Sequence, residues 1–316
     1  MSRSLKAHVL LVLNTLVWGV TFVVIKDALA EISPLYFNAV RMTLAAVCLA
    51  AVYWRSLLRL GVRKGDEGAR ATWIAGAVLG LFLWGGYEFQ TTGLVLTTPS
   101  KSAFLTGLSV VLVPVFLSLI WRRKVNHWTV TGVLAAFVGL YLLTVPAGET
   151  MFDISSVNRG DLLTVGCAIA FAFHIIFLGR ATKKHPFEQL AVLQTAFAAL
   201  LMWLTVPILE RPHAVWSPRV VWAILVTGVL CTAVAFSIQA WAQQFTPPTH
   251  TALIFALEPV FAWLTSYVVL HERLGGRAAA GAALILGGIL LSELLGRVVE
   301  PQPGVLAPAE LEEEGS

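Results

Sequence analysis

The chain consists largely of apolar runs of about 20 residues, and this feature limits its fold more than any other. Each run is long enough to cross about 30 Å of hydrocarbon as an α-helix. Because hydrocarbon offers the backbone no hydrogen-bonding partner, a spanning segment must bond within itself, as a helix does. We therefore expect an all-α integral membrane protein with ten transmembrane helices. The runs lie at residues 8–26, 34–54, 72–92, 100–121, 127–145, 160–179, 187–207, 219–241, 249–270 and 277–296.

The composition argues against a soluble protein. Of the 316 residues, 57% are hydrophobic and 13% are charged, whereas a soluble domain has about 25% charged residues. The connections between the runs are short and contain the Pro, Gly and charged residues. The apolar part of the first run is longer than that of a cleaved signal peptide, so we read it as an uncleaved span. Residues 298–316 are rich in Pro and acidic residues, and we expect a disordered tail.

Lysine and arginine residues indicate the orientation in the membrane. With a cytoplasmic N-terminus, the inside segments hold 14 of these residues and the outside segments hold seven. Basic residues concentrate on the cytoplasmic side of membrane proteins, so both termini are expected inside the cell. The net charge of +4 is then a topology signal, and it does not indicate nucleic-acid binding. The short loops favour the inner membrane of a bacterium.

The two halves of the chain repeat each other. Residues 87–142 align without a gap onto residues 236–291, a shift of 149 positions. Five helices per half is an odd number, so the second half must enter the membrane upside down, as in the inverted repeats of secondary transporters. We expect a first repeat at 1–146, a periplasmic linker at 147–159 and a second repeat at 160–297. The aligned pairs include Gln90 with Gln239, Pro99 with Pro248, Leu108 with Leu257, Gly132 with Gly281, and Gly139 with Gly288.

Several segments together resemble one family. They are LVWGVTFVVIK, SPLYFNAVR, TPSKSAFLTGLSVVLVP and TALIFALEPVFAWLTSYVVLHERL, and in this order they resemble the EamA-type permeases of the drug/metabolite transporter superfamily. The resemblance implies ten helices in two inverted five-helix repeats around a central cavity. It also implies export, or less often uptake, of small metabolites by an ion-coupled or exchange mechanism. The family is broad in substrate, so the resemblance names none.

Polar and aromatic side chains recur at helical spacing within the runs. Intramembrane polar groups usually face the protein interior, so these residues are candidates for the lining of a substrate cavity. Serine and threonine stripes also let helices pack closely, Trp18 and Tyr87 could be interface anchors, and His174 could be a hydrogen-bonded core residue. The candidates are Asn14, Trp18, Trp84, Tyr87, Glu88, Thr91, Ser109, His174, Gln239, Trp241 and Glu258.

Two of these candidates, Glu88 and Glu258, are carboxylic acids in the middle of apolar runs. A charge at that depth costs about 2.5–3.5 kcal/mol on insertion scales, so each must be protonated, paired or hydrated. Each could carry a proton or bind a substrate cation, or be locked by Arg41, Lys101 or His250. In permeases of the resembled family the triplet LEP is common, which implies a shared structural or gating role for Glu258. Glu88 departs from the family pattern and is a candidate for a role particular to this protein.

Two prolines fall inside predicted spans. A proline in a helix removes its own N–H bond and frees the carbonyl four residues earlier. Pro259 would thereby free Phe255, and Pro114 would free Val110. Such breaks survive in membranes where protein or a water-filled cavity satisfies the freed group. The two prolines could act as matched hinges or as static bends.

The residues that an enzyme would need are missing from the sequence. The three cysteines lie singly in different runs, HERLG lacks the second histidine of a zinc-protease motif, and no phosphate-binding loop occurs. We expect no cofactor and no metal.

The sequence predicts a secondary transporter of small metabolites, such as an exporter of amino acids, nucleobases or related compounds. It would work by alternating access, with membrane lipids as partners and protons or exchange as the driving force. The alternative is an intramembrane enzyme acting on a lipid or prenyl substrate.

Overall fold

The computed structural model describes residues 2–62, 67–97, 99–145, 148, 158–270 and 275–296. Most of the expected linker at 147–159 and the expected tail at 298–316 lie outside these residues. Helices make up the regular structure of the described residues, and Ile32 and Ala214 form an isolated antiparallel bridge. The helices are α1 (Arg3–Ala28), α2 (Pro34–Val52), α3 (Trp54–Val62), α4 (Glu67–Leu96), α5 (Pro99–Gly107), α6 (Ser109–Leu119), α7 (His127–Thr144), α8 (Arg159–Ala181), α9 (Phe187–Leu209), α10 (Pro218–Gly228), α11 (Ala235–Ala242), α12 (Pro248–Phe255), α13 (Glu258–Leu270) and α14 (Gly276–Leu295).

Among the described residues, seven helical segments are long and apolar enough to cross a membrane. They are α1, α2, α7, α8, α9, the continuous stretch Pro218–Ala242, and α14. The other three predicted runs lie on α4, on α5 with α6, and on α12 with α13. Helix α3 was not predicted, because its residues were assigned to a connection. The stretch Pro218–Ala242 joins α10 to α11 through a π-helical turn, Val229–Val234, which was also not predicted.

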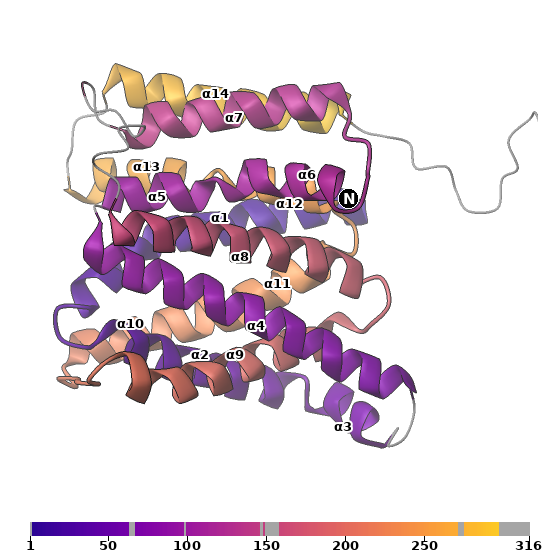
Figure 1. Cartoon of the computed structure of the whole chain (residues 1–316), viewed down its shortest axis with the longest axis vertical. Coiled ribbons are helices and arrows are strands. Elements are labelled where there is room, and N and C mark those ends of the chain that lie inside the picture. Colours follow the sequence, from indigo (N-terminus) through magenta and orange to yellow (C-terminus); the bar gives the residue numbers. More distant parts are fainter. Residues whose placement is uncertain are drawn as a thin grey trace, which may run out of the picture.

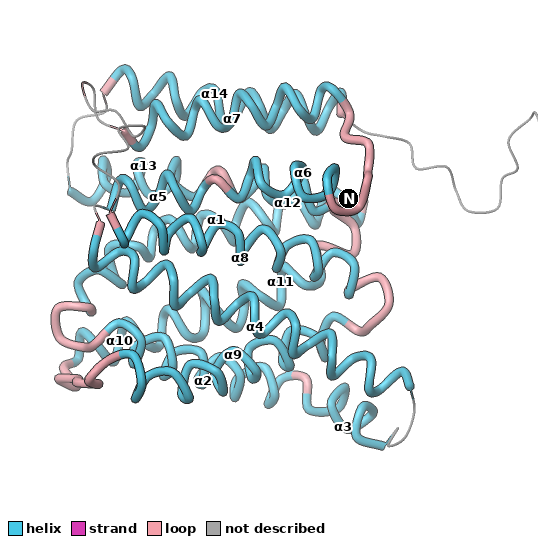
Figure 2. The backbone as a smooth tube through the Cα atoms, in the orientation of Figure 1, coloured by secondary structure: helices cyan, strands magenta, loops and turns pink. Residues whose placement is uncertain are grey.

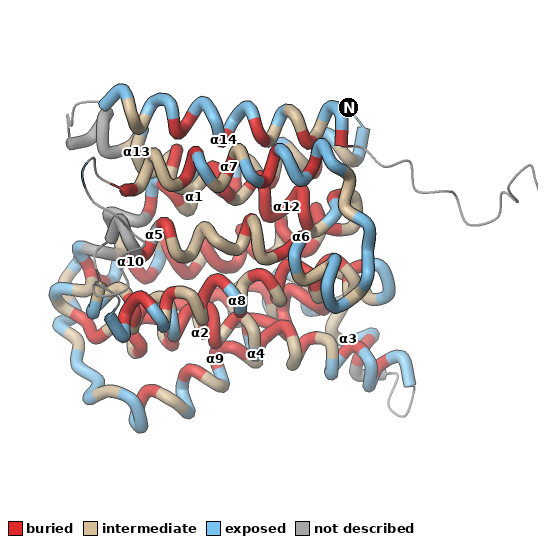
Figure 3. The backbone as a smooth tube through the Cα atoms, turned by 45° about the horizontal axis from the view of Figure 1, so that its top comes forward, coloured by how far each residue is buried: buried red, intermediate tan, exposed pale blue. Residues whose placement is uncertain are grey.

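The long helices lie side by side, and the connections gather at the two ends of the bundle (Figures 1 and 2). Helices α7 and α14 form one edge, and α2, α9 and α10 lie near the other. Exposed segments concentrate on the outer faces (Figure 3). One such face is an apolar stripe at helical spacing along α1, as expected for a surface that contacts lipid. The stripe consists of Leu5, Val9, Leu13, Leu16 and Val20.

Helices α7 and α14 pack through glycines. The backbone of Gly139 lies so close to Gly281 that a Cβ on Gly139 would be 2.5 Å from the Gly281 carbonyl oxygen. A Cβ on Gly281 would likewise be 2.5 Å from the Gly139 carbonyl oxygen. Gly132 and Gly288 approach each other in the same way. Small residues allow this close packing of membrane helices. The sequence repeat pairs Gly132 with Gly281 and Gly139 with Gly288, so the contacts run crosswise between equivalent positions, the pattern that a two-fold axis produces.

The predicted run at 100–121 is interrupted at Leu108, between α5 and α6. There the N–H of Leu108 donates to the carbonyl of Leu105 at 3.2 Å, three residues earlier, which is a 3₁₀-type turn. The regular pattern resumes when Leu112 donates to the Leu108 carbonyl at 2.9 Å.

The run at 249–270 has an interruption at the equivalent place, between α12 and α13. The N–H of Leu257 donates to the Ile254 carbonyl at 3.0 Å, and Phe261 donates to the Leu257 carbonyl at 2.9 Å. Ile254, Leu257 and Phe261 are each 149 positions after Leu105, Leu108 and Leu112, respectively. The two breaks therefore have the same hydrogen-bond pattern at matched positions.

The placement of one of the two prolines differs from the prediction. Pro259 is the second residue of α13, so it begins a helix and does not interrupt one. A missing N–H has no cost at that position, because the first N–H groups of a helix have no partner within it. Pro114 does lie inside a helix, but α6 continues past it. The chain breaks at residues 108 and 256–257 instead.

A carboxylate from a distant segment caps the start of α2. Glu210, which follows α9, accepts hydrogen bonds from the Ser33 hydroxyl at 2.9 Å and from the N–H groups of Leu35 and Tyr36 at 3.2 and 2.6 Å. A negative charge at a helix N-terminus is favourable because the first N–H groups are unpaired and the helix dipole is positive there. The end of α9 and the start of α2 are thus held together.

We expect Gly139→Ala to lower the melting temperature of the detergent-solubilised protein. The added methyl group would meet backbone atoms of α14, and overpacking of this kind costs about 1–3 kcal/mol. The matched control is Gly287→Ala on α14, where no atom outside the neighbouring backbone of the same helix lies within 4 Å of the new Cβ. That variant should be neutral or gain about 0.5–1 kcal/mol from the higher helix propensity of alanine. Equal melting temperatures for the two variants would contradict the close contact.

Replacing Glu210 by alanine should also destabilise the protein. Loss of the cap on α2 is expected to cost about 0.5–2 kcal/mol, measurable as a lower melting temperature. Glu31→Ala serves as comparison, because Glu31 pairs with an Arg219 side chain that is 63% exposed and such pairs contribute about 0–1 kcal/mol. A larger loss for Glu31→Ala than for Glu210→Ala would speak against the cap.

Candidate functional site

A cavity of about 390 Å³ lies between the helices and is bordered by both halves of the chain. Its polar and charged lining comes from α1, α2, α4, α5, α6, α7, α8, α11, α13 and the π-helical turn. Aromatic rings from α1, α4, α8, α11, α12 and α13 complete the wall. The polar, charged and aromatic lining residues are Trp18, Thr21, Asn38, Arg41, Tyr87, Gln90, Thr91, Ser102, Thr106, Ser109, Thr144, Phe171, His174, Cys231, Phe236, Gln239, Phe255, Glu258 and Trp263.

The structure brings most of the predicted site residues to this one cavity, but not all. Asn14, Trp84, Glu88, Trp241 and Pro114 do not line it. Trp84 donates to the Thr205 hydroxyl in the contact between α4 and α9, and Trp241 packs against Phe245. The predicted residues in the cavity wall are Trp18, Tyr87, Thr91, Ser109, His174, Gln239, Glu258 and Pro259.

Glu258 lies at the break between α12 and α13, where α13 begins, and it lines the cavity. No hydrogen bond or ion pair joins its carboxyl group to another residue in the part of the chain that the structure describes. Helix α1 comes very close at this point because Gly19 has no side chain. A Cβ on Gly19 would lie 2.8 Å from the Glu258 carbonyl oxygen and 2.9 Å from the Ala262 nitrogen.

The π-helical turn is tied to α1 by side-chain hydrogen bonds. The indole N–H of Trp18 donates to the Cys231 carbonyl at 2.8 Å, and the Asn14 amide donates to the Ala235 carbonyl at 3.3 Å. A π turn displaces backbone carbonyls from the regular ladder, and such turns are frequent at functional sites. Trp18 lines the cavity as predicted, and its indole also satisfies a carbonyl of the opposite half, a role that sequence analysis missed.

Arg41 on α2 is a buried cation in the cavity wall. It is 4% exposed, and its guanidinium carbon lies 4.3 Å from the centre of the Tyr87 ring and 5.5 Å from that of Phe37. Its Nε has no hydrogen-bond acceptor among the described residues, and no described carboxylate is within ion-pair distance. Among the described residues its close contacts are with aromatic faces, so this desolvated charge is well placed to meet an anionic group of a ligand.

Further polar groups of the wall are held by hydrogen bonds within the protein. His174 Nε2 lies 2.9 Å from the Gln194 side-chain oxygen. The Gln239 amide donates to Gln243 at 3.3 Å, whereas its own oxygen has no partner among the described groups. Asn38 donates to the Thr91 hydroxyl at 2.8 Å and so joins α2 to α4. The cavity therefore has oriented donors and acceptors.

Glu88 is buried on α4 outside the cavity. It is 3% exposed, and neither carboxyl oxygen has a hydrogen-bond partner in the described part of the chain. Sequence analysis predicted that Glu88 lines the cavity, and the structure places it elsewhere on α4. Spacing along one helix does not by itself determine which face meets the cavity. Tyr87 and Glu88 are neighbours in sequence, and only the first lines the cavity.

Sequence analysis did not include several lining residues among its site candidates. Arg41 appeared there only as a partner for a glutamate, although a single arginine well inside an apolar run was a strong signal. Phe171, Phe236 and Phe255 gave no signal, because phenylalanine is common in any membrane helix. His8, His250 and Glu293, which could share a metal ion, lie outside the cavity.

Comparisons with known proteins agree with this architecture. A model of the EamA-like transporter family matches the chain twice, over residues 5–145 and 158–294. A protein of Archaeoglobus fulgidus named an uncharacterized transporter is 32% identical over 292 residues, which cover 92% of this chain and 87% of the relative. The uncharacterized transporter YoaV of Bacillus subtilis is 24% identical over 280 residues, 88% of this chain and 93% of that one.

Two other matches are more distant. A WAT1-related protein of Arabidopsis thaliana is 23% identical over 193 residues, which are 54% of this chain and 52% of the relative. A solved crystal structure superposes with a TM-score of 0.73 at 22% identity, over 94% of this chain and 99% of that one, and supports the fold alone. Because the family model covers both halves and the archaeal relative aligns along nearly the whole chain, this multi-pass membrane protein belongs to the EamA-like transporter family.

Proposed function

We propose that the protein is a secondary transporter that moves small metabolites out of the cell by alternating access. The observation that carries this proposal is the cavity bordered by both halves, with Glu258 and Arg41 in its wall. The guanidinium of Arg41 has no ion-pair partner among the described residues, and its Nε has no hydrogen-bond acceptor there. Ionisable groups within membrane spans are costly and usually mark a substrate or ion pathway. A volume of about 390 Å³ falls within the usual range of small-molecule sites, roughly 300–1,000 Å³.

The transporter would consist of ten transmembrane helices in two inverted repeats, residues 1–146 and 160–297, joined by a periplasmic linker at 147–159. Three observations support this arrangement. The family model matches once in each half. The glycine contacts of α7 and α14 run crosswise between equivalent positions. The helix breaks at Leu108 and Leu257 have equivalent hydrogen bonds. Both termini would be cytoplasmic in a bacterial inner membrane, with the acidic tail at 298–316 inside the cell.

The matched breaks suggest how access would alternate. In an inverted repeat, the two halves can exchange conformations and so open the central site to one side or the other. Hinges are positions near helix ends that absorb a change in backbone angles. We infer that the turns at Leu108 and Leu257 are these hinges, with Pro259 fixing the direction in which α13 leaves its turn and Pro114 shaping α6.

The wall chemistry favours a substrate with a carboxylate and a flat or apolar part. Arg41 would receive the carboxylate, because a guanidinium binds this group with two parallel hydrogen bonds. Trp18, Tyr87 and Phe255 would contact the apolar part. Amino acids with large side chains fit this description, and nucleobases and related compounds provide a flat ring for the aromatic wall. Glu258 would take up and release a proton as the cavity opens to either side.

Transport should be measured in proteoliposomes with an imposed pH gradient and a pooled panel of amino acids, nucleobases and aromatic compounds. We expect gradient-driven accumulation for the wild type. Glu258→Gln keeps the shape of the side chain but cannot exchange a proton, so it should lose the response to the pH gradient. It should still exchange substrate across the membrane when the substrate concentrations inside and outside the vesicles are equal. Glu88→Gln, which changes a buried carboxyl group outside the cavity, should keep both activities.

Full gradient-driven accumulation by Glu258→Gln would refute its role in coupling. Loss of coupling in Glu88→Gln alone would assign that role to Glu88. If the folded wild type moves no compound of the panel in either assay, the proposed substrate class is wrong.

Replacing Arg41 by glutamine should weaken binding of carboxylate substrates. Hydrogen bonds to a charged group contribute about 1.5–3 kcal/mol, so the half-saturation concentration should rise about 10–100-fold. The matching amine, which lacks the carboxylate, serves as a control substrate and should be transported equally by the variant and the wild type. An equal rise for the acid and the amine would indicate that Arg41 supports the structure only.

A further inference from the structure

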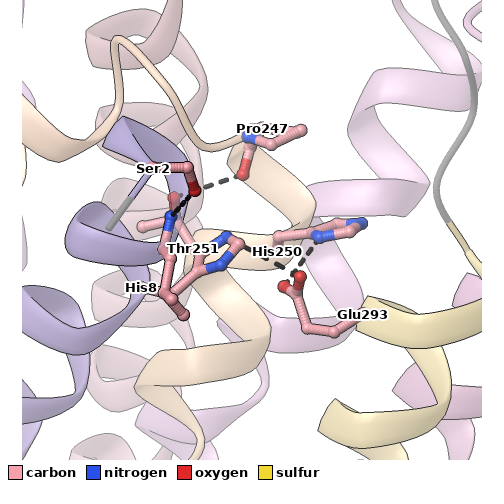
Figure 4. Close-up of polar contacts among 7 residues, drawn as sticks. Ser2, His8, Pro247, His250, Thr251 and Glu293 are labelled. Carbon is pink, nitrogen blue, oxygen red and sulfur yellow. Dashed lines mark hydrogen bonds and ion pairs between the residues drawn. The ribbon is translucent and has the colours of Figure 1, made fainter.

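Two histidines and a glutamate meet at the end of the bundle where the N-terminus lies (Figure 4). His250 Nδ1 lies 2.7 Å from one carboxylate oxygen of Glu293, and His8 Nε2 lies 3.7 Å from the other. The three possible ligand atoms are within 4.8 Å of one another. This cluster is separate from the central cavity, whose lining includes none of the three.

The cluster joins helices that are distant in the sequence. His8 lies in the second turn of α1, His250 in the first turn of α12, and Glu293 near the end of α14. Figure 4 shows the two imidazole rings on different sides of the Glu293 carboxylate. One carboxylate therefore links the first half of the chain to two helices of the second half.

The donor set and the spacing fit a transition-metal ion. Imidazole nitrogens and a carboxylate oxygen are ligands for Zn²⁺ and similar divalent cations. Two donor atoms that each lie about 2.0–2.1 Å from a tetrahedral Zn²⁺ lie roughly 3.3 Å apart. The separations of 2.7 Å from His250 and 3.7 Å from His8 are measured to the two different oxygens of the Glu293 carboxylate, and they lie on either side of this value. The ligand atoms of all three residues lie within 4.8 Å of one another, so rotations of the side chains can bring them around one ion.

The cluster is sheltered but remains accessible. The side chains of His8, His250 and Glu293 are 18%, 11% and 15% exposed. Partial burial restricts the conformations of the three side chains, so little further ordering is needed when they bind an ion. The remaining exposure allows an ion to enter from the aqueous side. A water molecule could complete the tetrahedron, because three protein ligands leave one position open.

We propose that His8, His250 and Glu293 form a binding site for a divalent transition-metal ion, with Zn²⁺ as the probe. Occupancy would join the ends of α1, α12 and α14 through metal–ligand bonds. The proposal does not depend on transport, because the ion would bind the folded protein whatever passes through the cavity.

The test is equilibrium zinc binding to the full-length protein, purified in detergent without a polyhistidine tag. We expect one Zn²⁺ per chain and a rise in melting temperature on binding, since a ligand that binds the native state stabilises it. His8→Ala, His250→Ala and Glu293→Gln should each weaken binding by more than about 100-fold, a larger loss than the 10–100-fold typical of groups that only orient a ligand. The control His127→Ala, at the exposed start of α7, should bind as the wild type does.

Two results would overturn the site. No saturable zinc binding by the wild type would mean that the cluster is a hydrogen-bonded network only. Binding that survives in the variants would place the ion elsewhere. A variant that fails to fold is recognised by its elution in size-exclusion chromatography, and His8→Gln then replaces His8→Ala, because it preserves polarity at this position and cannot supply an imidazole.

Discussion

A helix that is interrupted inside a membrane must find other partners for its backbone, and this constraint shapes the centre of the protein. The turns at Leu108 and Leu257 are tolerated because each bonds three residues back and then returns to the regular pattern. The π-helical turn meets the same demand differently, since Trp18 donates to the Cys231 carbonyl. The irregular backbone lies around the cavity, where protein groups or water can satisfy it.

Close packing of regular helices away from the cavity holds the irregular segments at the centre in place. The glycines of α7 and α14 bring two backbones together at the edge of the bundle. The Glu210 cap fixes the start of α2, which carries Arg41 and Asn38 into the cavity wall. Packing of this kind can hold a buried guanidinium in place, although its charge has no partner among the described residues.

The sequence was sufficient for the placement of most helices, because an apolar run of about 20 residues has few alternatives to a helix. It also identified Leu108 and Leu257, as well as the glycine pairs, as equivalent positions. It could not show that the helices break at these leucines, because leucine is not typical of turns. The breaks were predicted at the nearby prolines instead. It ranked Glu88 above Glu258 as a functional candidate, since spacing along one helix does not determine which face meets the cavity. Arg41 was interpreted only as a partner for a glutamate, because the sequence does not show that no carboxylate lies within ion-pair distance of it among the described residues.

The π-helical turn also affects the phase of the helix that contains it. Each residue of an α-helix advances the chain by about 100° around the axis, and a π turn accommodates one residue more than an α turn. If the same residues were wound as a regular α-helix, everything that follows would be rotated by about 100° relative to α10. Phe236 and Gln239 would then leave the cavity wall, whereas deleting one residue of Val229–Val234 would remove the π turn and keep them facing the cavity. The cavity thus depends on how one turn is wound as well as on the residues that form it.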